Sequence, residues 1–214
     1  MLIGPSVFAC NSGANDHVYG TALWNPAYSN SGALARILVS QGQCSNCSKW
    51  EYGGVHQELW EGTADTSFGN NWVEIGYTYG YEYKSGLTWF WADQRPGYSF
   101  NWHQITAGIT VGDWYNMKIW DDSSNDTWYA AIDGTTYGAS YPNASGSKWM
   151  QAGLEAMDGY QKLDNTYANQ LQYRQSSTWY SSWSGAGLVC TPPAVSNWVT
   201  NETYYEVHDS INNS

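Results

Sequence analysis

Two short segments each place a glutamate beside a glycine in a strand-like pattern, an arrangement suited to paired carboxylic acids. They are residues 72–77 and 150–156. Side chains at i and i+2 of a strand share a face, so Glu74 shares a face with Gly76, and Glu155 with Gly153. A glycine in a strand often marks a site where a ligand or another backbone comes close. We therefore expect Glu74 and Glu155 to meet across one groove and to carry out acid–base chemistry.

Hydrolysis of a peptide bond by two carboxyl groups requires one ionised and one protonated group. The ionised group takes a proton from the attacking water, and the protonated one polarises the carbonyl and then protonates the leaving nitrogen. Two neighbouring carboxyl groups do not both ionise easily, so one apparent pKa rises. This chemistry has an acidic working range and requires no metal or cofactor. Sequence alone assigns neither role to either glutamate, and Gln151, on the face of Glu155, is a candidate donor to the oxyanion.

Large aromatic side chains near these segments are candidates for the lining of the groove. Trp72 shares a face with Glu74, whereas Trp89 and Trp91 share a face with Asp93 in a neighbouring segment. The three tryptophans line the groove if the two faces coincide, and otherwise they fill the core. Asp93 either supports a glutamate through a hydrogen bond or caps a turn. The pattern leaves both pairs of alternatives open.

The composition indicates an acidic β protein. The 214 residues include 22 Gly, 14 Trp and 18 Tyr, only 13% are charged, and the net charge is −11. Many aromatic residues and turn formers favour an all-β fold. The acidity argues against a nucleic-acid partner and suits a secreted protein. No apolar stretch approaches the length of a membrane span, and residues 1–5 are too short and uncharged for a signal peptide. We expect a secreted monomer that acts on a peptide or protein substrate and binds neither nucleic acid nor membrane.

The four cysteines are interpreted as disulfide partners. They are Cys10, Cys44, Cys47 and Cys190. A zinc site is the competing reading for the closely spaced Cys44 and Cys47, but it would need a second close pair of Cys or His. Four cysteines allow three disulfide connectivities, and the sequence does not choose among them.

Short strand patterns recur along the chain, with turn signals roughly every 8 to 12 residues. The expected strands are residues 17–24, 34–39, 55–60, 72–77, 87–93, 100–105, 114–120, 127–132, 135–138, 150–156, 171–174 and 177–183. Asp133-Gly134 is the strongest hairpin signal. This spacing predicts an antiparallel two-sheet β-sandwich of the jelly-roll or concanavalin-like kind. We expect one domain over residues 1–190 and a polar C-terminal tail over 191–214.

An ordered set of motifs resembles the neprosin family of plant and bacterial glutamic endopeptidases. In chain order these motifs are 20–26, ending in Trp-Asn-Pro; 73–77, with Glu-x-Gly-aromatic; 88–93, an aromatic strand ending in Asp; the hairpin segments 117–121, 127–129 and 133–134; and 151–155, Gln-x-Gly-x-Glu. Their order and rough spacing agree with the family from about residue 18 to 160. The cysteine pattern and the segment after residue 160 depart from it.

The resemblance implies an antiparallel β-sandwich whose two catalytic glutamates correspond to Glu74 and Glu155. Because the related fungal glutamic peptidases have Gln where Glu74 stands, the pair of glutamates favours the neprosin type. The implied activity is a secreted, acid-active endopeptidase with a preference for proline at the cleavage site. Two other classes remain open: a carbohydrate-binding or glycoside-hydrolysing jelly roll, whose Trp and Tyr side chains would stack on sugars, and a non-catalytic secreted relative.

Overall fold

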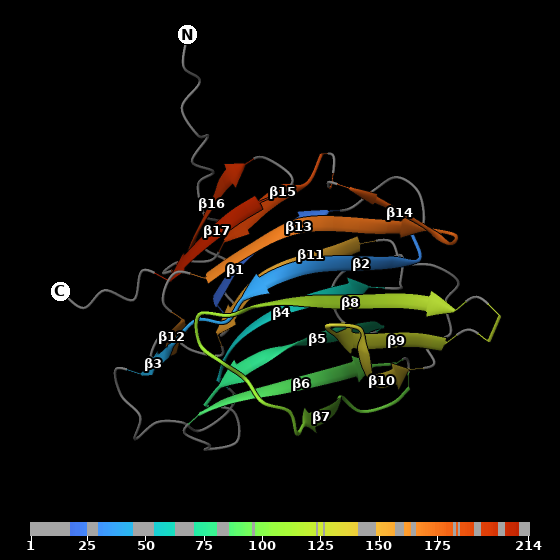
Figure 1. Ribbon diagram of the computed structural model, residues 1–214, viewed down its shortest axis with the longest axis horizontal. Helices are drawn as coiled ribbons and strands as arrows, with labels where there is room; N and C mark the ends of the chain where they lie inside the picture. The colour runs from blue at the N-terminus through green and yellow to red at the C-terminus, as the bar shows by residue number, and fades with distance from the viewer. Residues whose placement is uncertain are drawn as a thin grey trace, which may run out of the picture.

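Every regular element in the described part of the chain is a β-strand. The computed structural model describes residues 18–24, 30–44, 54–62, 71–80, 86–95, 97–122, 124–125, 127–140, 149–156, 161–163, 166–181, 183, 185–190, 194–200 and 204–209. No helix that could cross a membrane occurs within these ranges. The strands form two antiparallel sheets stacked as a sandwich, so the predicted fold class is confirmed (Figure 1).

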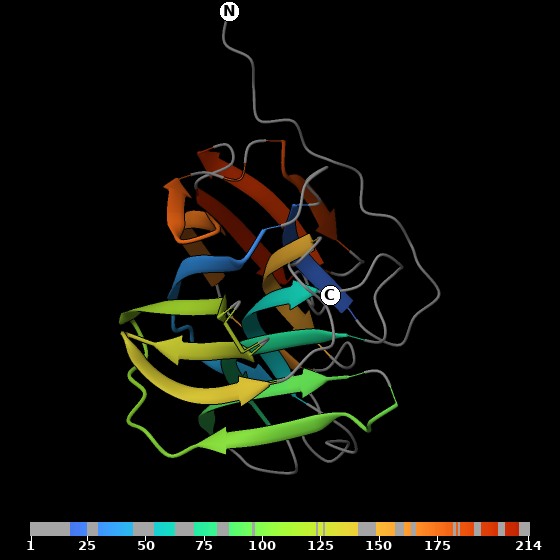
Figure 2. The same cartoon turned by 90° about the vertical axis from the view of Figure 1, so that its right-hand side faces the viewer.

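The first sheet, sheet I, has seven strands. In spatial order they are β15 (Gly187–Cys190), β1 (Val18–Trp24), β11 (Trp149–Ala156), β4 (Val55–Gly62), β5 (Trp72–Tyr79), β6 (Leu87–Gln94) and β7 (Asn101–Ile105). The early strand β1 lies beside the late strand β11 (Figure 2). The two segments that carry Glu74 and Glu155 therefore lie in one sheet, separated by β4 alone.

The second sheet, sheet II, has eight strands and covers one face of sheet I. They are β10 (Thr135–Ser140), β9 (Thr127–Ile132), β8 (Trp114–Asp122), β2 (Gly32–Leu38), β13 (Thr166–Gln175), β17 (Tyr204–Asp209) and β16 (Ala194–Thr200), with β14 (Thr178–Ser181) paired to β13. A separate pair is formed by β3 (Gly42–Cys44) and β12 (Gln161–Leu163).

Alternate side chains of both sheets fill the space between them. The core includes Leu59, Ile75 and Leu154 from sheet I and Ile37, Met117 and Ile119 from sheet II, all 0% exposed. The hydroxyl of buried Tyr77 accepts a hydrogen bond from the backbone N–H of Ser40 and lies 2.8 Å from Gln57 Oε1. This face of sheet I, the inner face, is therefore committed to packing. The opposite face of sheet I is called the outer face.

The β9–β10 hairpin confirms the strongest local turn prediction. Asp133 and Gly134 both have positive φ angles, 46° and 81°. A two-residue turn of this kind matches the twist of the flanking strands, and Asp-Gly is a favoured sequence for it. The Asp133 carboxylate also accepts a hydrogen bond from the backbone N–H of Asn116 at 2.8 Å, which ties the turn to β8.

The chain after Cys190 differs from the expected polar tail. Strands β16 and β17 pair with each other, and β17 pairs with β13, so both belong to sheet II. Trp198 of β16 is partly buried against the core, and Ser196, two residues before it, is buried as well, so this strand packs onto the sandwich.

The disulfide prediction cannot be followed in the described residues. Cys190 is buried at the end of β15. Cys10 and Cys47, and the side chain of Cys44, lie outside the described part. The pairing therefore stays a prediction.

Candidate active site

The register of sheet I places Glu74 and Glu155 on the same face. Glu74 lies opposite Trp60 of β4, and Glu155 lies opposite His56 of the same strand. Trp60 and His56 lie four positions apart in one strand, so they share a face, and the two glutamates share it with them. This is the outer face, because Leu59 and Ile75, which alternate with Trp60 and Glu74 along their strands, point into the core.

A third glutamate lies at the centre of this arrangement. Glu58 of β4 is directly opposite Gly76 on one side and directly opposite Gly153 on the other. The three glutamates therefore form a diagonal across β11, β4 and β5, with Glu58 in the middle. Its segment is an expected strand, but sequence reasoning did not single out Glu58. The two strand glycines could have identified it, because Gly76 and Gly153 both lie opposite Glu58 once the strands are paired.

The two glycines mark close approaches of neighbouring strands. A Cβ atom at Gly76 would lie 2.5 Å from the Cβ of Glu58. A Cβ atom at Gly153, whose φ is +154°, would lie 2.7 Å from the Cα of Thr21 on β1. Both distances are shorter than Cβ contacts that real side chains make. Gly76 thus clears space for Glu58, and Gly153 allows β1 to approach β11.

The carboxyl group of Glu74 is almost withdrawn from solvent, since the residue is only 6% exposed. Burial is the largest cause of a pKa raised well above the ordinary value, and the charge of Glu155 raises it further. Hydrogen bonds from the side chains of Trp60 and Glu58 oppose this shift, because they stabilise the ionised form. Glu155 is half-buried and therefore better solvated than Glu74.

Glu58 is the most deeply buried of the three, with an exposed fraction of 0%. Burial raises the pKa of Glu58 most, followed by the charges of Glu74 and Glu155 and by hydrogen bonding with each of them. Among the described residues, no neutral or basic group donates a hydrogen bond to its carboxyl oxygens. Glu58 is therefore held in the protonated form over the acidic range.

Tyr19 completes the cluster from β1. It lies opposite Glu155 in the β1–β11 ladder, and its hydroxyl donates a hydrogen bond to the Glu155 carboxyl. Burial raises the pKa of Tyr19, and the charges of all three glutamates raise it further. The phenol thus stays protonated and remains a donor to Glu155. Sequence reasoning missed Tyr19, because the register between the first and eleventh strands is not encoded locally.

Mutual repulsion favours protonated forms in this cluster of acids. Carboxyl groups so close together do not all ionise easily, so some of them retain protons. The site therefore holds both proton donors and proton acceptors at acidic pH. In the described ranges, no group of three His, Cys, Asp or Glu side chains is arranged to hold a metal ion.

Aromatic residues do surround the site, but they differ in part from the expected ones. Trp72 is half-exposed on the outer face, and its ring lies 5.6 Å from that of Phe100. Phe90 and Trp102 stack on the same face with ring centroids 6.1 Å apart, and Trp60 lies beside Glu74. These rings supply the apolar surroundings of the carboxyl groups.

Of the two alternatives left open for Trp89 and Trp91, the structure shows that they fill the core and do not line the groove. In the β5–β6 ladder they lie opposite Tyr77 and Ile75, so they point into the core. Trp89 is 1% exposed, and its indole N–H donates to the Gly108 carbonyl at 3.0 Å. Strand β6 carries large aromatic residues on both faces, so its sequence does not tell which face is outside, and the register alone decides.

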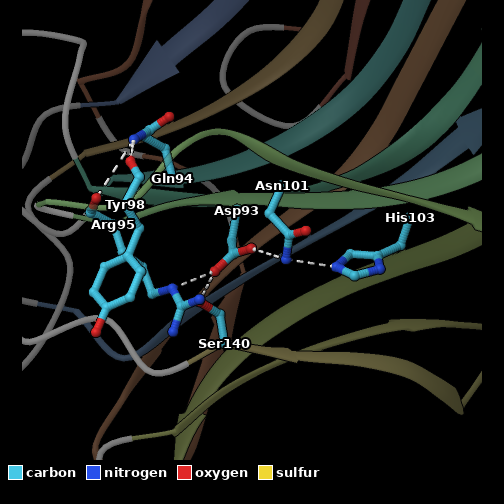
Figure 3. Close-up of polar contacts among 7 residues, drawn as sticks. All are labelled: Asp93, Gln94, Arg95, Tyr98, Asn101, His103 and Ser140. Atoms are coloured by element: carbon cyan, nitrogen blue, oxygen red, sulfur yellow. Dashed lines mark hydrogen bonds and ion pairs between the residues drawn. The ribbon is translucent and has the colours of Figure 1, made fainter.

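Asp93 also lies on the inner face and does not support either glutamate. Its carboxylate accepts hydrogen bonds from Ser140 Oγ at 2.5 Å and Asn101 Nδ2 at 3.1 Å, and it forms an ion pair with Arg95 at 3.0 Å (Figure 3). The Asn101 side-chain nitrogen also forms a hydrogen bond with His103 Nε2, and the His103 ring stacks on Trp91. Ser140 belongs to β10, so Asp93 ties the two sheets together. Neither proposed role of Asp93 describes this position.

Gln151 lies on the outer face opposite Trp60, as its pattern predicts. Its side-chain nitrogen donates to Thr21 Oγ1 at 2.6 Å, and the residue is buried. Gln151 thus fixes the β1–β11 pairing next to the glutamates. Its role as a donor to an oxyanion stays a prediction.

Solved structures share this fold at low sequence identity. Scytalido-glutamic peptidase, solved with a transition-state analogue inhibitor, is 12% identical and matches 90% of this chain and 98% of its own, with a TM-score of 0.56. A β-glucanase from Bacillus licheniformis is 10% identical over 80% of this chain and 88% of its own, with a TM-score of 0.47. No protein-family model and no curated protein sequence matches the chain. The chain therefore has a sandwich fold like that of a glutamic peptidase.

Proposed function

We propose that this protein is a glutamic endopeptidase that cleaves peptide bonds at acidic pH with Glu74 and Glu155. The observation that carries the proposal is the placement of these two glutamates on the same outer face of sheet I, on either side of Glu58. They differ in burial, which separates a proton donor from a proton acceptor. The fold that the chain shares with scytalido-glutamic peptidase agrees with this reading.

The burial of each glutamate suggests its role. Glu155 is the better solvated, and Tyr19 donates a hydrogen bond to it, so we assign Glu155 as the general base for water. Glu74 is buried with a raised pKa, so it keeps its proton and acts as the general acid. In the first step Glu155 takes a proton from water as the oxygen attacks the carbonyl carbon. Glu74 then delivers its proton to the leaving nitrogen as the C–N bond breaks.

The finer assignment follows the motif resemblance. A pair of glutamates, and not Gln with Glu, favours the neprosin type, with a secreted, monomeric enzyme and a preference for proline near the cleaved bond. The aromatic residues beside the site, Trp72 and Trp102, are suited to pack against a proline ring. These features remain parts of the proposal.

The test is cleavage of casein and of proline-containing peptides between about pH 3 and pH 7. We expect activity at the acidic end, and a loss of about 10²–10⁴-fold in kcat for Glu74→Gln and Glu155→Gln, the usual contribution of a general acid or base. Glu61→Gln is the matched control, because Glu61 is also a buried glutamate of β4 but lies on the inner face. Undiminished cleavage by either site variant would refute the pair.

A parallel assay on soluble β-glucans and other polysaccharides tests the competing enzyme class. Glycosidases also use two carboxyl groups, and aromatic side chains also stack on sugars. Sugar release that depends on Glu74 and Glu155, without peptide cleavage, would replace the proposed function with a glycoside hydrolase. Binding of either polymer without turnover would favour a non-catalytic relative.

A further inference from the structure

Glu58 is positioned to act on the reacting groups without meeting the substrate. Both of its carboxyl oxygens are shielded from solvent, whereas Glu155 is half-exposed on the same face. A peptide bound over the outer face could reach Glu155 but not the Glu58 carboxyl. Any effect of Glu58 on catalysis must therefore pass through the side chains that surround it.

The titratable groups that face Glu58 come from each neighbouring strand. Glu74 lies on β5, Glu155 on β11, Tyr19 on β1 and His56 on β4 itself. Strand β6 presents only uncharged residues, such as Phe90, on this side. Within the described residues, two side chains lower the pKa of Glu74 through hydrogen bonds that stabilise its carboxylate. They are the Trp60 indole and Glu58 itself.

We propose that Glu58 is a positioning residue that keeps its own proton and donates a hydrogen bond to the carboxylate that forms on Glu74 during catalysis. This inference rests on the proposed function. When the Glu74 O–H bond breaks, the new N–H bond forms on the leaving amine and the electron pair stays on the Glu74 oxygen. That oxygen is buried and cannot be stabilised by bulk water. Glu58 is the diagonal neighbour of Glu74 across the β4–β5 ladder, and the absence of a side chain at Gly76 leaves room for it, so its O–H group can supply the donor in place of water.

The expected pH effect follows from the state that each group must hold. The active enzyme has Glu155 ionised and Glu74 protonated, so activity falls at high pH when Glu74 ionises. A hydrogen bond from Glu58 favours ionised Glu74 and lowers the pKa of Glu74 relative to a site without the donor. Removal of the donor should therefore move the alkaline limb of the kcat profile to higher pH and make Glu74 a weaker acid.

The experiment compares Glu58→Met, which removes the donor, with Glu58→Gln, which retains an N–H donor of similar shape. For Glu58→Met we expect kcat to fall about tenfold, KM to stay within about twofold, and the alkaline limb to move up by about one pH unit. For Glu58→Gln we expect both limbs of the pH profile to stay close to the wild type. A purely structural role predicts lower thermal stability for both variants and no movement of the limb, and that outcome would overturn the proposal.

Infrared spectroscopy tests the proton itself and requires no activity. Glu58 and Glu74 should both contribute to the carbonyl stretch of protonated carboxylic acids at a pH well above the ordinary glutamate range, so Glu58→Gln should remove one component of this band, whereas Glu61→Gln should leave that component in place. If this band is missing from the wild type, Glu58 is ionised and the proposal is wrong. The two proposals fail separately: active Glu74→Gln and Glu155→Gln variants refute the peptidase, whereas inactive ones beside an unchanged Glu58→Met profile refute only the role of Glu58.

Discussion

Sheet I buries Asp93 on its inner face and Glu58 on its outer face, and the side chains around these two acids differ in kind. On the inner face, Asp93 is surrounded by Ser140, Asn101 and Arg95, which donate to its oxygens. On the outer face, Glu58 is surrounded by other acids. Both residues are almost inaccessible to water. Their neighbours, and not their depth, distinguish the two environments.

The difference shows how burial leads to structure in one place and to chemistry in another. A carboxylate with three donors is satisfied as an ion, and it stabilises the fold by joining two sheets. A buried carboxyl group surrounded by other carboxyl groups favours its protonated form, so its affinity for a proton is raised. Burial of an acid therefore identifies a reactive site only when the compensating donors are missing.

The largest stability effect should come from the satisfied acid. Asp93→Ala leaves Ser140 and Asn101 without their acceptor and Arg95 without its partner, so we expect a loss of about 3 kcal/mol in the free energy of unfolding. The shape of the pH–activity profile should not change, because Asp93 points away from the glutamates. Urea unfolding and a pH–rate curve of the same sample test both statements. A displaced pH profile would mean that the two acidic regions are coupled.

A methyl group at Gly76 should disturb the cluster of glutamates on the outer face directly, because it would meet Glu58. Because the added Cβ would lie 2.5 Å from the Cβ of Glu58, Gly76→Ala must push β4 from β5 at the site. Overpacking of this kind typically destabilises a protein by about 1–3 kcal/mol. Activity should fall more than for Gly108→Ala, where an added Cβ meets no atom within 4 Å. Thermal melting and cleavage rates compare the two, and equal behaviour would show that the close approach is not needed.

The raised pKa of Glu58 predicts that the stability of the folded protein declines as pH rises. The pKa of Glu58 is raised on folding, so the folded state holds a proton that the unfolded chain releases as pH rises. Its contribution to stability is therefore complete below the ordinary glutamate pKa and declines as pH rises toward the folded value. Each pKa unit corresponds to about 1.4 kcal/mol.

Glu58→Gln removes this titration, so the variant should lose less stability than the wild type between about pH 4.5 and pH 7. Differential scanning calorimetry across this range measures the effect. Asp93→Asn serves as the contrast, since it should not flatten the curve in this way. A parallel decline for Glu58→Gln and the wild type would place the pH sensitivity elsewhere in the chain.

The smallest effect concerns the donor at the edge of the site. Tyr19→Phe removes the hydroxyl that bonds to Glu155 but keeps the ring between β1 and β11. We expect a loss of about 1 kcal/mol in transition-state stabilisation, or about fivefold in kcat/KM, and an acid limb displaced to higher pH because Glu155 ionises less easily. Steady-state rates between about pH 2.5 and pH 5 would reveal it. An unchanged acid limb would remove Tyr19 from the reacting group.

The fold class could be predicted from the sequence because most strands have a recognisable local residue pattern. The alternation in β4 and β5, and the Asp133-Gly134 turn, act over a few residues and survive in the structure. The segment after residue 190 differs from the expected polar tail because it pairs with sheet II and its Trp198 packs, partly buried, against the core. Local composition does not show which other strand will cover a side chain.

Only part of the site could be predicted from the sequence, for a related reason. The face of Glu74 relative to Gly76 follows from the two-residue period alone, and the same holds for Glu155 and Gly153. The faces of Trp89, Trp91 and Asp93 required the pairing of β5 with β6, where a slip of one residue exchanges inside for outside. Glu58 and Tyr19 required the pairing of four strands, which no single segment specifies.

The order of strands in sheet I also has a consequence for how the protein folds. The cluster draws on β1, β4, β5 and β11, and the β1–β11 and β11–β4 ladders join segments that are distant along the chain. Pairings of this kind form late, since the loop entropy must be overcome before the contacts stabilise it. Glu58 and Glu74 acquire their raised pKa values only when these ladders close and bury them. An unfinished chain of this protein therefore carries ordinary, solvated glutamates, and reactivity toward peptides would begin only with the completed sheet.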